Sequence, residues 1–277
     1  MRIKEIIQSR NNPLVKWVST LADKKGRAAS GSFIAEGVKL TVEALTSSAI
    51  VTHVLIAESK FELIKKEIEE KIDSRIEDAP EVYILSDSAF EKISTERAPQ
   101  GVISVIKYLD FFSNISIIYK EEFFLKDEEL ALALFSVRDP SNLGAVIRSA
   151  VAFGIEHIVL SADCADPYNP KAVRAAMGCL FKVKITRVED FTGFIVALRN
   201  NNRRAYAAEL SPGSIALNDV KLHASDVFVI GNEGHGISSE VSSLCTDSVY
   251  IPISAKAESL NASVAASILL WEISKAR

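Results

Sequence analysis

The residues best suited to chemistry lie in two polar loops near the C-terminal end of the sequence. A predicted strand, Val227–Ile230, leads into the glycine-rich turn Gly231–Gly236, which carries Glu233. A second predicted strand, Ser248–Ile251, leads into an irregular loop over residues 253–261. Open α/β sheets bind ligands where strands end in such loops. We therefore expect the active site at this end of the chain.

A second candidate is the segment Arg138–Arg148. Its strand is expected to end near Val137, and Asn142 can cap the helix that carries Arg148. Free N–H groups at a helix start, together with a guanidinium, could bind a phosphate. The simpler alternative is a capped helix with a surface arginine.

Several enzyme classes lose support from the motifs. The spacing of Gly231, Gly234 and Gly236 is G-x-x-G-x-G, whereas dinucleotide-binding folds use G-x-G-x-x-G after their first strand. A nucleotide-dependent oxidoreductase is therefore disfavoured. The sequence has no P-loop, no G-x-S-x-G elbow and no H-E-x-x-H helix, which disfavours nucleotide hydrolases, serine esterases and zinc proteases.

Composition indicates a globular protein in a reducing compartment. The chain has 277 residues, of which 48% are hydrophobic and 25% charged, as in soluble domains. The apolar run Ala262–Trp271 is too short to span a bilayer, and the N-terminus has no export signal. Cys164, Cys179 and Cys245 are odd in number and lack metal-ligand spacing. We expect a cytoplasmic protein with no membrane segment and no metal.

Charge is unevenly distributed. The net charge is −4, yet residues 1–39 contain eight Lys or Arg residues against three Asp or Glu residues. A locally basic segment favours contact with phosphates. A solvated helix face explains the same pattern, and charge alone leaves both open.

The N-terminal half alternates between predicted helices and strands, which indicates a small α/β domain. Pro13 begins a helix that is expected to end at Lys24–Arg27. We place this domain at residues 1–107. Residues 108–129 are acidic and irregular, and we assign them to a linker or extension.

The second domain, residues 130–277, begins with the continuously apolar segment Leu130–Phe135. Such a segment is typical of a central parallel strand. Regular alternation of strands and helices follows, so we predict a mostly parallel sheet with helices on both faces.

The motifs, taken together and in order, resemble those of the SpoU (TrmH) RNA ribose methyltransferases. The resemblance rests on Asn142–Arg148, Gly231–Gly234 and Ile251–Pro252 followed by Ser259–Asn261, and Asn169–Gly178 also looks like that family. N-terminal segments resemble its substrate-binding domain: 9–13, 24–27, 33–37 and 99–102. The family often has glycine at Ala255 and serine at Ala176, and we interpret these two differences as subfamily variation.

This resemblance implies a deep trefoil knot, although protein chains are almost never knotted. It also implies a homodimer that forms through the knotted region. It implies an enzyme that methylates a ribose 2′-hydroxyl in RNA with S-adenosylmethionine as donor. The implied functional residues are Arg148, Asn142, Glu233, Ser259 and Asn261 for catalysis; Gly231, Ile251, Leu260 and Asn261 for the cofactor; and Lys24, Lys25, Arg27 and Arg174 for RNA.

The residues fit these roles chemically. A guanidinium has a pKa above about 12, so Arg148 is expected to anchor an RNA phosphate and stabilise a developing alkoxide. Glu233 either contacts Arg148 or a partner subunit, or complements the dipole of the helix after Gly236. Ser259 and Asn261 can also cap the helix that begins near Ala262.

Ribosomal RNA is the expected substrate, because a separate N-terminal domain of this pattern resembles ribosomal RNA enzymes. The alternatives are a transfer RNA 2′-O-methyltransferase and a non-catalytic RNA-binding or ribosome-assembly protein on the same scaffold.

Overall fold

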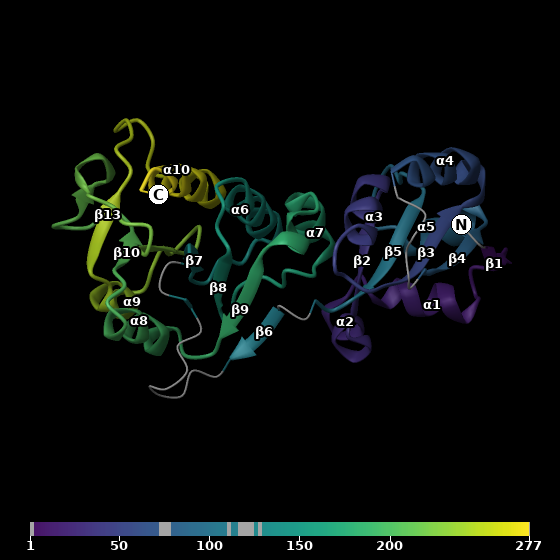
Figure 1. Cartoon of the computed structure of the whole chain (residues 1–277), viewed down its shortest axis with the longest axis horizontal. Coiled ribbons are helices and arrows are strands. Elements are labelled where there is room, and N and C mark those ends of the chain that lie inside the picture. Colours follow the sequence, from purple (N-terminus) through teal and green to yellow (C-terminus); the bar gives the residue numbers. More distant parts are fainter. Residues whose placement is uncertain (1–2, 72–78, 110–111, 116–124, 127–128, 277) are drawn as a thin grey trace. The chain divides into compact units, whose positions relative to one another are not determined.

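The computed structural model (Figure 1) describes residues 3–71, 79–109, 112–115, 125–126 and 129–276. The chain forms two compact units. The first unit comprises Met1–Leu109 and Asp166–Phe181, and the second comprises Asp110–Ala165 and Lys182–Arg277. Asp166–Phe181 falls within the domain predicted at 130–277, but its contacts group it with the first unit.

The first unit has a five-stranded sheet in the order β1-β4-β3-β5-β2. Strands β1, β4 and β3 are parallel, and β5 runs antiparallel to β3 and β2. The strands are β1 (Ile3–Ile7), β2 (Ser32–Glu36), β3 (Val51–Ala57), β4 (Glu81–Leu85) and β5 (Val102–Lys107). Strand β1 was not predicted, since four of its five residues are exposed and it has no alternating apolar face.

The helices of the first unit are α1 (Pro13–Thr20), α2 (Lys24–Ser30), α3 (Val38–Leu45), α4 (Phe61–Lys71), α5 (Asp87–Ile93) and α7 (Pro170–Ala176), with 3-10 turns η1 (Glu58–Lys60) and η2 (Cys179–Lys182). The predicted helix end at Lys24–Arg27 is wrong. Helix α1 ends at Thr20, and Lys24 begins a separate helix that stops at Gly31 in the left-handed conformation, φ 58°. Glycine adopts this conformation without a steric penalty.

The segment Asp166–Phe181 is anchored in the first unit by a buried tyrosine. The Tyr168 ring, 1% exposed, stacks on Phe33 at 4.5 Å and on Tyr108 at 4.4 Å between centroids. Its hydroxyl accepts a hydrogen bond from the Leu109 backbone N–H at 2.9 Å. Aromatic burial with a satisfied hydroxyl makes this a stable anchor.

The second unit has an eight-stranded sheet in the order β11-β13-β10-β12-β7-β8-β9-β6. Every strand pair in it is parallel, which confirms the predicted parallel sheet. The strands are β6 (Phe112–Ile115), β7 (Ala131–Leu134), β8 (His157–Ser161), β9 (Lys184–Val188), β10 (Ala205–Ala208), β11 (Ile215–Ala216), β12 (Val227–Ile230) and β13 (Asp247–Tyr250).

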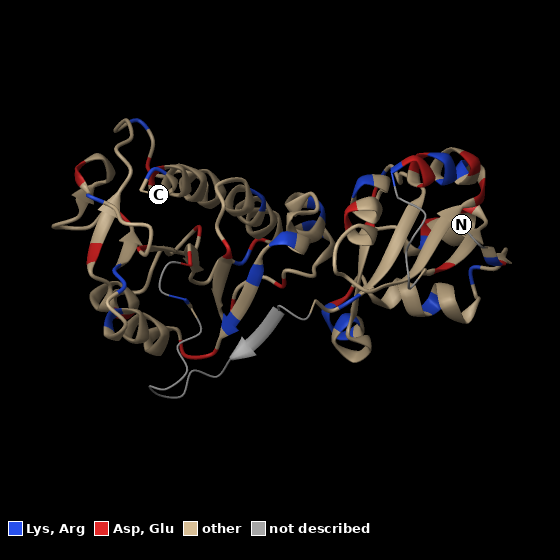
Figure 2. Cartoon of the chain, viewed as in Figure 1, with Lys and Arg blue, Asp and Glu red and all other residues tan. Residues whose placement is uncertain are grey.

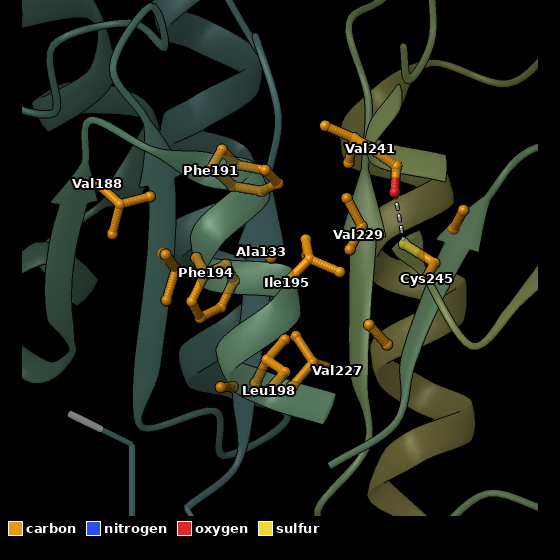
Figure 3. Close-up of a cluster of buried hydrophobic side chains, with 14 of the residues drawn as sticks. Ala133, Val188, Phe191, Phe194, Ile195, Leu198, Val227, Val229, Val241 and Cys245 are labelled. Carbon is orange, nitrogen blue, oxygen red and sulfur yellow. Dashed lines mark hydrogen bonds between the residues drawn. The ribbon is translucent and has the colours of Figure 1, made fainter. Parts of the chain in front are cut away.

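Helices cover both faces of this sheet, as predicted (Figure 1). They are α6 (Pro140–Ala152), α8 (Phe191–Asn200), α9 (Ser239–Leu244) and α10 (Ala262–Ser274), with the 3-10 turn η3 (Leu217–Asp219). On one face, buried Phe194 and Ile195 of α8 pack toward Val227 and Val229 of β12 (Figure 3). On the other, α6 packs against α10, and the Ser149 and Ser267 hydroxyls lie 2.8 Å apart.

Two predictions on the fold remain open. The linker, residues 108–129, falls largely outside the described residues, although its strand β6 pairs with β9. The trefoil knot is not established by the strand pairings and stays a prediction. Among the helices of the described residues, none combines the length and the apolar character that crossing a bilayer requires.

Candidate active site

Two of the candidate loops leave neighbouring strands at the same edge of the second unit's sheet. Strands β7 and β12 pair in parallel with Leu134 opposite Ile230, and the Phe135 N–H donates to the Ile230 carbonyl at 2.8 Å. The segment before α6 and the glycine turn therefore begin side by side. The third loop follows β13, which β10 separates from β12, and leads to α10.

Three predicted site residues meet in a polar cluster. The Asn142 side-chain amide donates to Glu233 Oε1 at 2.9 Å, and its Oδ1 accepts from Asn261 Nδ2 at 3.0 Å. The three side chains come from α6, the glycine turn and the start of α10. This cluster, Asn142, Glu233 and Asn261, is called the amide–carboxylate cluster below.

Asn142 belongs to this cluster because it does not cap its helix, contrary to the prediction. Helix α6 starts at Pro140, and the cap is Asp139, whose Oδ1 accepts from the Asn142 N–H at 2.8 Å. Asn142 therefore lies inside the first turn, and its side chain is available to other elements. Asn261, by contrast, caps α10 as predicted, accepting from the Ser263 N–H at 2.9 Å.

The glycine turn is closed by its own hydrogen bonds. Asn232 and Gly236 exchange two backbone bonds of 3.0 Å, and Asn232 Oδ1 accepts from the N–H groups of Gly234 and His235 at 2.8 and 3.1 Å. A Cβ on Gly231 would lie 2.4 Å from the Gly236 carbonyl carbon. Only glycine fits there, so the turn holds Glu233 in a fixed position.

Arg148 lies further along α6 and is exposed. Glu233 hydrogen-bonds Asn142 and Asn232, not Arg148, so the predicted contact with Arg148 within the chain is absent from the described residues. On a helix, residues six apart are separated by about 120° around the axis. Arg148 therefore lies to one side of Asn142 on α6, and its exposed guanidinium is open to a ligand.

The loop before α10 offers unpaired backbone donors. In the described part of the chain, the N–H groups of Ile251 and Leu260 donate no backbone hydrogen bond. Ser259 is exposed and Leu260 is half-buried. Adenine and ribose groups are bound by such free backbone groups in irregular loops, so Gly231, Ile251 and Leu260 fit the predicted cofactor role. Within the described residues, no group of three His, Cys, Asp or Glu could hold a metal.

The predicted RNA-binding residues in the first unit differ in exposure. Lys24 and Lys25 are exposed on α2, where basic residues gather (Figure 2). Arg174 is also exposed, pairs with Glu96, and lines a groove of about 620 Å³ together with Arg97 and Lys171.

Arg27 requires a correction. Its side chain is 1% exposed and bonds Asp166 Oδ2 through Nε and Nη2 at 3.1 and 2.6 Å. Nη1 donates to the carbonyls of Leu21 and Ala22. The guanidinium is committed within the unit, so Arg27 is a structural residue in this fold and not a phosphate contact.

Ser136, which lies before the predicted segment Arg138–Arg148, was not among the predicted site residues, yet it contacts the glycine turn. Asn232 Nδ2 donates to the Ser136 carbonyl at 2.7 Å. Ser136 has φ 58°, a conformation rare for a residue with a side chain. The glycines of 231–236 marked this turn in the sequence, whereas nothing in the sequence marked the backbone of Ser136.

Comparison with known proteins decides the family. The sequence model of the SpoU rRNA Methylase family matches residues 129–271, and that of the MRM3-like substrate binding domain matches residues 12–104. The chain belongs to the SpoU rRNA methylase family. The predicted resemblance is thus confirmed, and the SpoU match covers the whole amide–carboxylate cluster.

Individual relatives of this SpoU protein align over nearly its full length. The 23S rRNA (guanosine(2553)-2'-O)-methyltransferase RlmP of Bacillus subtilis is 29% identical over 98% of this chain and 99% of its own. The 23S rRNA (uridine(2479)-2'-O)-methyltransferase of Streptomyces viridochromogenes is 28% identical over 98% and 92%. The AdoMet-bound rRNA methyltransferase structure from Sinorhizobium meliloti is 28% identical, with a TM-score of 0.81 over 99% and 98% of the two chains.

Proposed function

We propose that this chain transfers the methyl group of S-adenosylmethionine to a ribose 2′-hydroxyl in ribosomal RNA. The single observation that carries the proposal is the amide–carboxylate cluster, in which Asn142, Glu233 and Asn261 from three separate elements meet through bonds of 2.9 and 3.0 Å. Polar side chains gathered this way at the carboxyl ends of parallel strands mark a ligand site. Two relatives named above are 23S rRNA 2'-O-methyltransferases.

The cofactor site proposed here consists of Gly231, Ile251 and Leu260, with Asn261 at its edge. Bound S-adenosylmethionine supplies a methyl group on a sulfonium, which a nucleophilic oxygen can displace. The relative from Sinorhizobium meliloti is an AdoMet-bound structure. In this chain, the support is the free N–H groups of Ile251 and Leu260 and the close approach of backbone around Gly231.

The chain's own contribution to the reaction is positioning. Displacement needs the 2′-oxygen in line at about 3 Å, and well-oriented reactants gain most of their rate from this alignment. We assign Asn142 and Glu233 to the ribose side, because Asn142 is fixed by two bonds and Glu233 by the closed turn. Ser259 and Asn261 complete the site from the loop before α10.

Arg148 anchors the substrate in this proposal. It is exposed on α6 and bears no ion pair within the described residues, so its guanidinium can grip a phosphate with two parallel bonds. The same charge stabilises the alkoxide that develops on the 2′-oxygen. The proton leaves to solvent or to another base.

The first unit contributes RNA affinity in this proposal. Of the residues predicted to bind RNA, three are exposed: Lys24, Lys25 and Arg174. The groove that Arg174 lines also contains Arg97 and Lys171. Helix α4 is not part of this surface, because its charges alternate and pair within the helix, as in Lys71–Glu67 (Figure 2). Phosphate contacts of this kind give affinity without sequence readout.

We also propose that the second unit forms a homodimer and that the protein acts in the cytoplasm. Helix α10 exposes Val264 (47%) and Trp271 (52%) on a helix that is apolar on most sides. Exposed apolar helix faces favour association, and a second copy is the partner we expect. The three cysteines are free thiols, in keeping with a reducing compartment.

Two alternative functions can be distinguished from the proposed one by experiment. A transfer RNA methyltransferase would modify transfer RNA in place of ribosomal RNA, and a non-catalytic assembly protein would bind RNA without methyl transfer. Calorimetry with S-adenosylmethionine, followed by transfer of a labelled methyl group to purified ribosomal RNA and transfer RNA, distinguishes them. The proposal predicts saturable binding and label in ribosomal RNA. A folded protein that shows no binding heat favours the assembly protein.

A further inference from the structure

A continuous hydrogen-bonded chain runs from Asp163 to the amide–carboxylate cluster. Asp163 accepts from the Ser136 hydroxyl and, at 2.6 Å, from the Ser161 hydroxyl. The Ser136 carbonyl accepts from Asn232 Nδ2 at 2.7 Å. Asn232 Nδ2 also donates to Glu233 Oε2 at 3.4 Å, and Glu233 Oε1 accepts from Asn142. The chain therefore links the end of β8 to the proposed ribose site.

Ser136 is the strained point of this chain. Its φ of 58° is left-handed, it is 8% exposed, and it follows β7 by two residues. A residue with a side chain keeps such a conformation only where its surroundings hold it, and such residues cluster at functional sites. Here the hydroxyl is held by Asp163, and the N–H by Ser161 Oγ at 2.8 Å.

Asp163 is suited to hold this conformation. Burial opposes its ionisation, yet hydrogen bonds from Ser136, Ser161 and Arg138 lower its pKa to about 2. The Arg138 bond is 3.0 Å long. The carboxylate is therefore charged over the whole working pH range and accepts all three donors.

We propose that Asp163 and Ser136 are positioning residues for methyl transfer: Asp163 holds Ser136 in its left-handed conformation, which aims the Ser136 carbonyl at Asn232 and so sets the place of Glu233 and Asn142. This inference rests on the proposed function of that cluster. Neither residue touches the reacting atoms. Their effect is on the geometry of the glycine turn relative to α6.

Four variants test the proposal: Asp163→Ala, Ser136→Ala, Ser136→Gly and the double variant Ser136→Gly with Asp163→Ala. Asp163→Ala and Ser136→Ala should lower kcat on ribosomal RNA by about 10- to 100-fold, since misplacement of about 1 Å costs that much. Ser136→Gly keeps the carbonyl and takes positive φ freely, so it should stay within about threefold of wild type. For the same reason, glycine should rescue Asp163→Ala in the double variant.

Hydrogen exchange of the peptide that covers residues 227–238 gives a readout independent of catalysis. Exchange in the turn should rise in Asp163→Ala and return toward wild type in the double variant. Asp190→Ala is the matched control: like Asp163→Ala it removes a carboxylate that accepts from a side-chain hydroxyl, here at 2.6 Å, and this carboxylate also caps the start of α8 by accepting from the Gly193 N–H at 2.8 Å. It should leave the turn's exchange unchanged.

The inference is overturned if Asp163→Ala leaves both kcat and the turn's exchange at wild-type values. It is equally overturned if glycine at 136 fails to rescue the Asp163 variant, because a purely structural loss would persist in the double variant. A wild-type protein that transfers no methyl group contradicts the proposed function instead, and the exchange data still decide the role of Asp163.

Discussion

Asn142 Nδ2 donates to Glu233 Oε1 at 2.9 Å across 91 residues of sequence. This bond joins the first turn of α6 to the turn after β12, and Asn261 extends it to the start of α10. Each partner alone has an ordinary local explanation. Their meeting is what favours a shared role in binding the ribose.

Asn142→Asp tests that bond with almost no change of shape. It places a second carboxylate beside Glu233, and like charges at this distance repel each other and raise the pKa of one member. We expect methyl transfer to fall roughly 100-fold near pH 8 and to recover partly at lower pH, where one proton is shared. Rates from pH 6 to 9 give the measurement. Asn200→Asp, on the exposed end of α8, adds the same charge and should leave the rate unchanged; equal losses in both variants would refute the role of Asn142.

Gly231→Ala should disrupt the cofactor site, and Gly234→Ala should not. A Cβ at Gly231 would lie 2.4 and 2.6 Å from the backbone of Gly236, whereas one at Gly234 meets only Asn232 Oδ1 at 3.5 Å. We expect at least a tenfold loss of S-adenosylmethionine affinity for Gly231→Ala, measured by calorimetry. Similar affinity in the two variants would show that the turn does not shape the site.

Two variants in the first unit distinguish a structural role from an RNA-binding role: Arg27→Ala tests folding stability, and Lys24→Ala tests RNA binding. Removing one partner of the buried Arg27–Asp166 pair should cost about 3–5 kcal/mol of folding free energy. Lys24→Ala should leave thermal stability unchanged, weaken RNA binding and reduce the salt dependence of log K by roughly one. Denaturant unfolding and filter binding at several salt concentrations measure the two effects. A stable Arg27→Ala protein with weakened RNA binding would reverse our assignment.

Arg148→Lys keeps the positive charge but loses the two-pronged guanidinium contact, so most activity should be lost. Single-turnover rates on ribosomal RNA measure this effect. Arg199→Lys, on the exposed side of α8, is the matched control. Near-normal turnover in Arg148→Lys would remove Arg148 from the mechanism.

His157 should make folding stability depend on pH. Burial lowers its pKa to about 4, and this outweighs the opposing effect of Glu129. Between that value and the unfolded value near 6.5, the unfolded chain binds more protons, so stability falls as pH decreases through this window. From pH 7 to 5, the loss should be roughly 2 kcal/mol. In His157→Gln, unfolding at both pH values should show a loss smaller by that amount; an unchanged pH dependence would contradict the assignment.

The fold could be predicted because its signals are local. Continuous apolar runs such as 130–135 mark central parallel strands, and Pro and Gly residues mark helix limits. Strand β1 could not be predicted from such signals because its residues are mostly exposed. Its stability comes from pairing with β4, which no local pattern reveals.

The candidate site could be predicted only in part, because some of its contacts join residues far apart in the sequence. Asn142 and Asp139 are both good caps, and only the start of α6 at Pro140 decides between them. In the sequence, Arg27 looks like a surface cation. Its ion-pair partner Asp166 lies 139 residues away, so no local pattern reveals the pairing. No sequence motif marks Ser136. Its proposed role depends on its positive φ, which the hydrogen bond from its hydroxyl to Asp163 maintains.

The most direct test of the central claim is the position of 2′-O-methyl groups in ribosomal RNA from a strain that lacks this gene. A 2′-O-methyl group blocks alkaline cleavage at its nucleotide, so each site can be mapped by resistance to alkali. We predict that one resistant position disappears in the deletion strain, returns with the wild-type gene, and stays absent with Asn142→Asp. An unchanged map in the deletion strain, or full restoration by Asn142→Asp, would contradict the account.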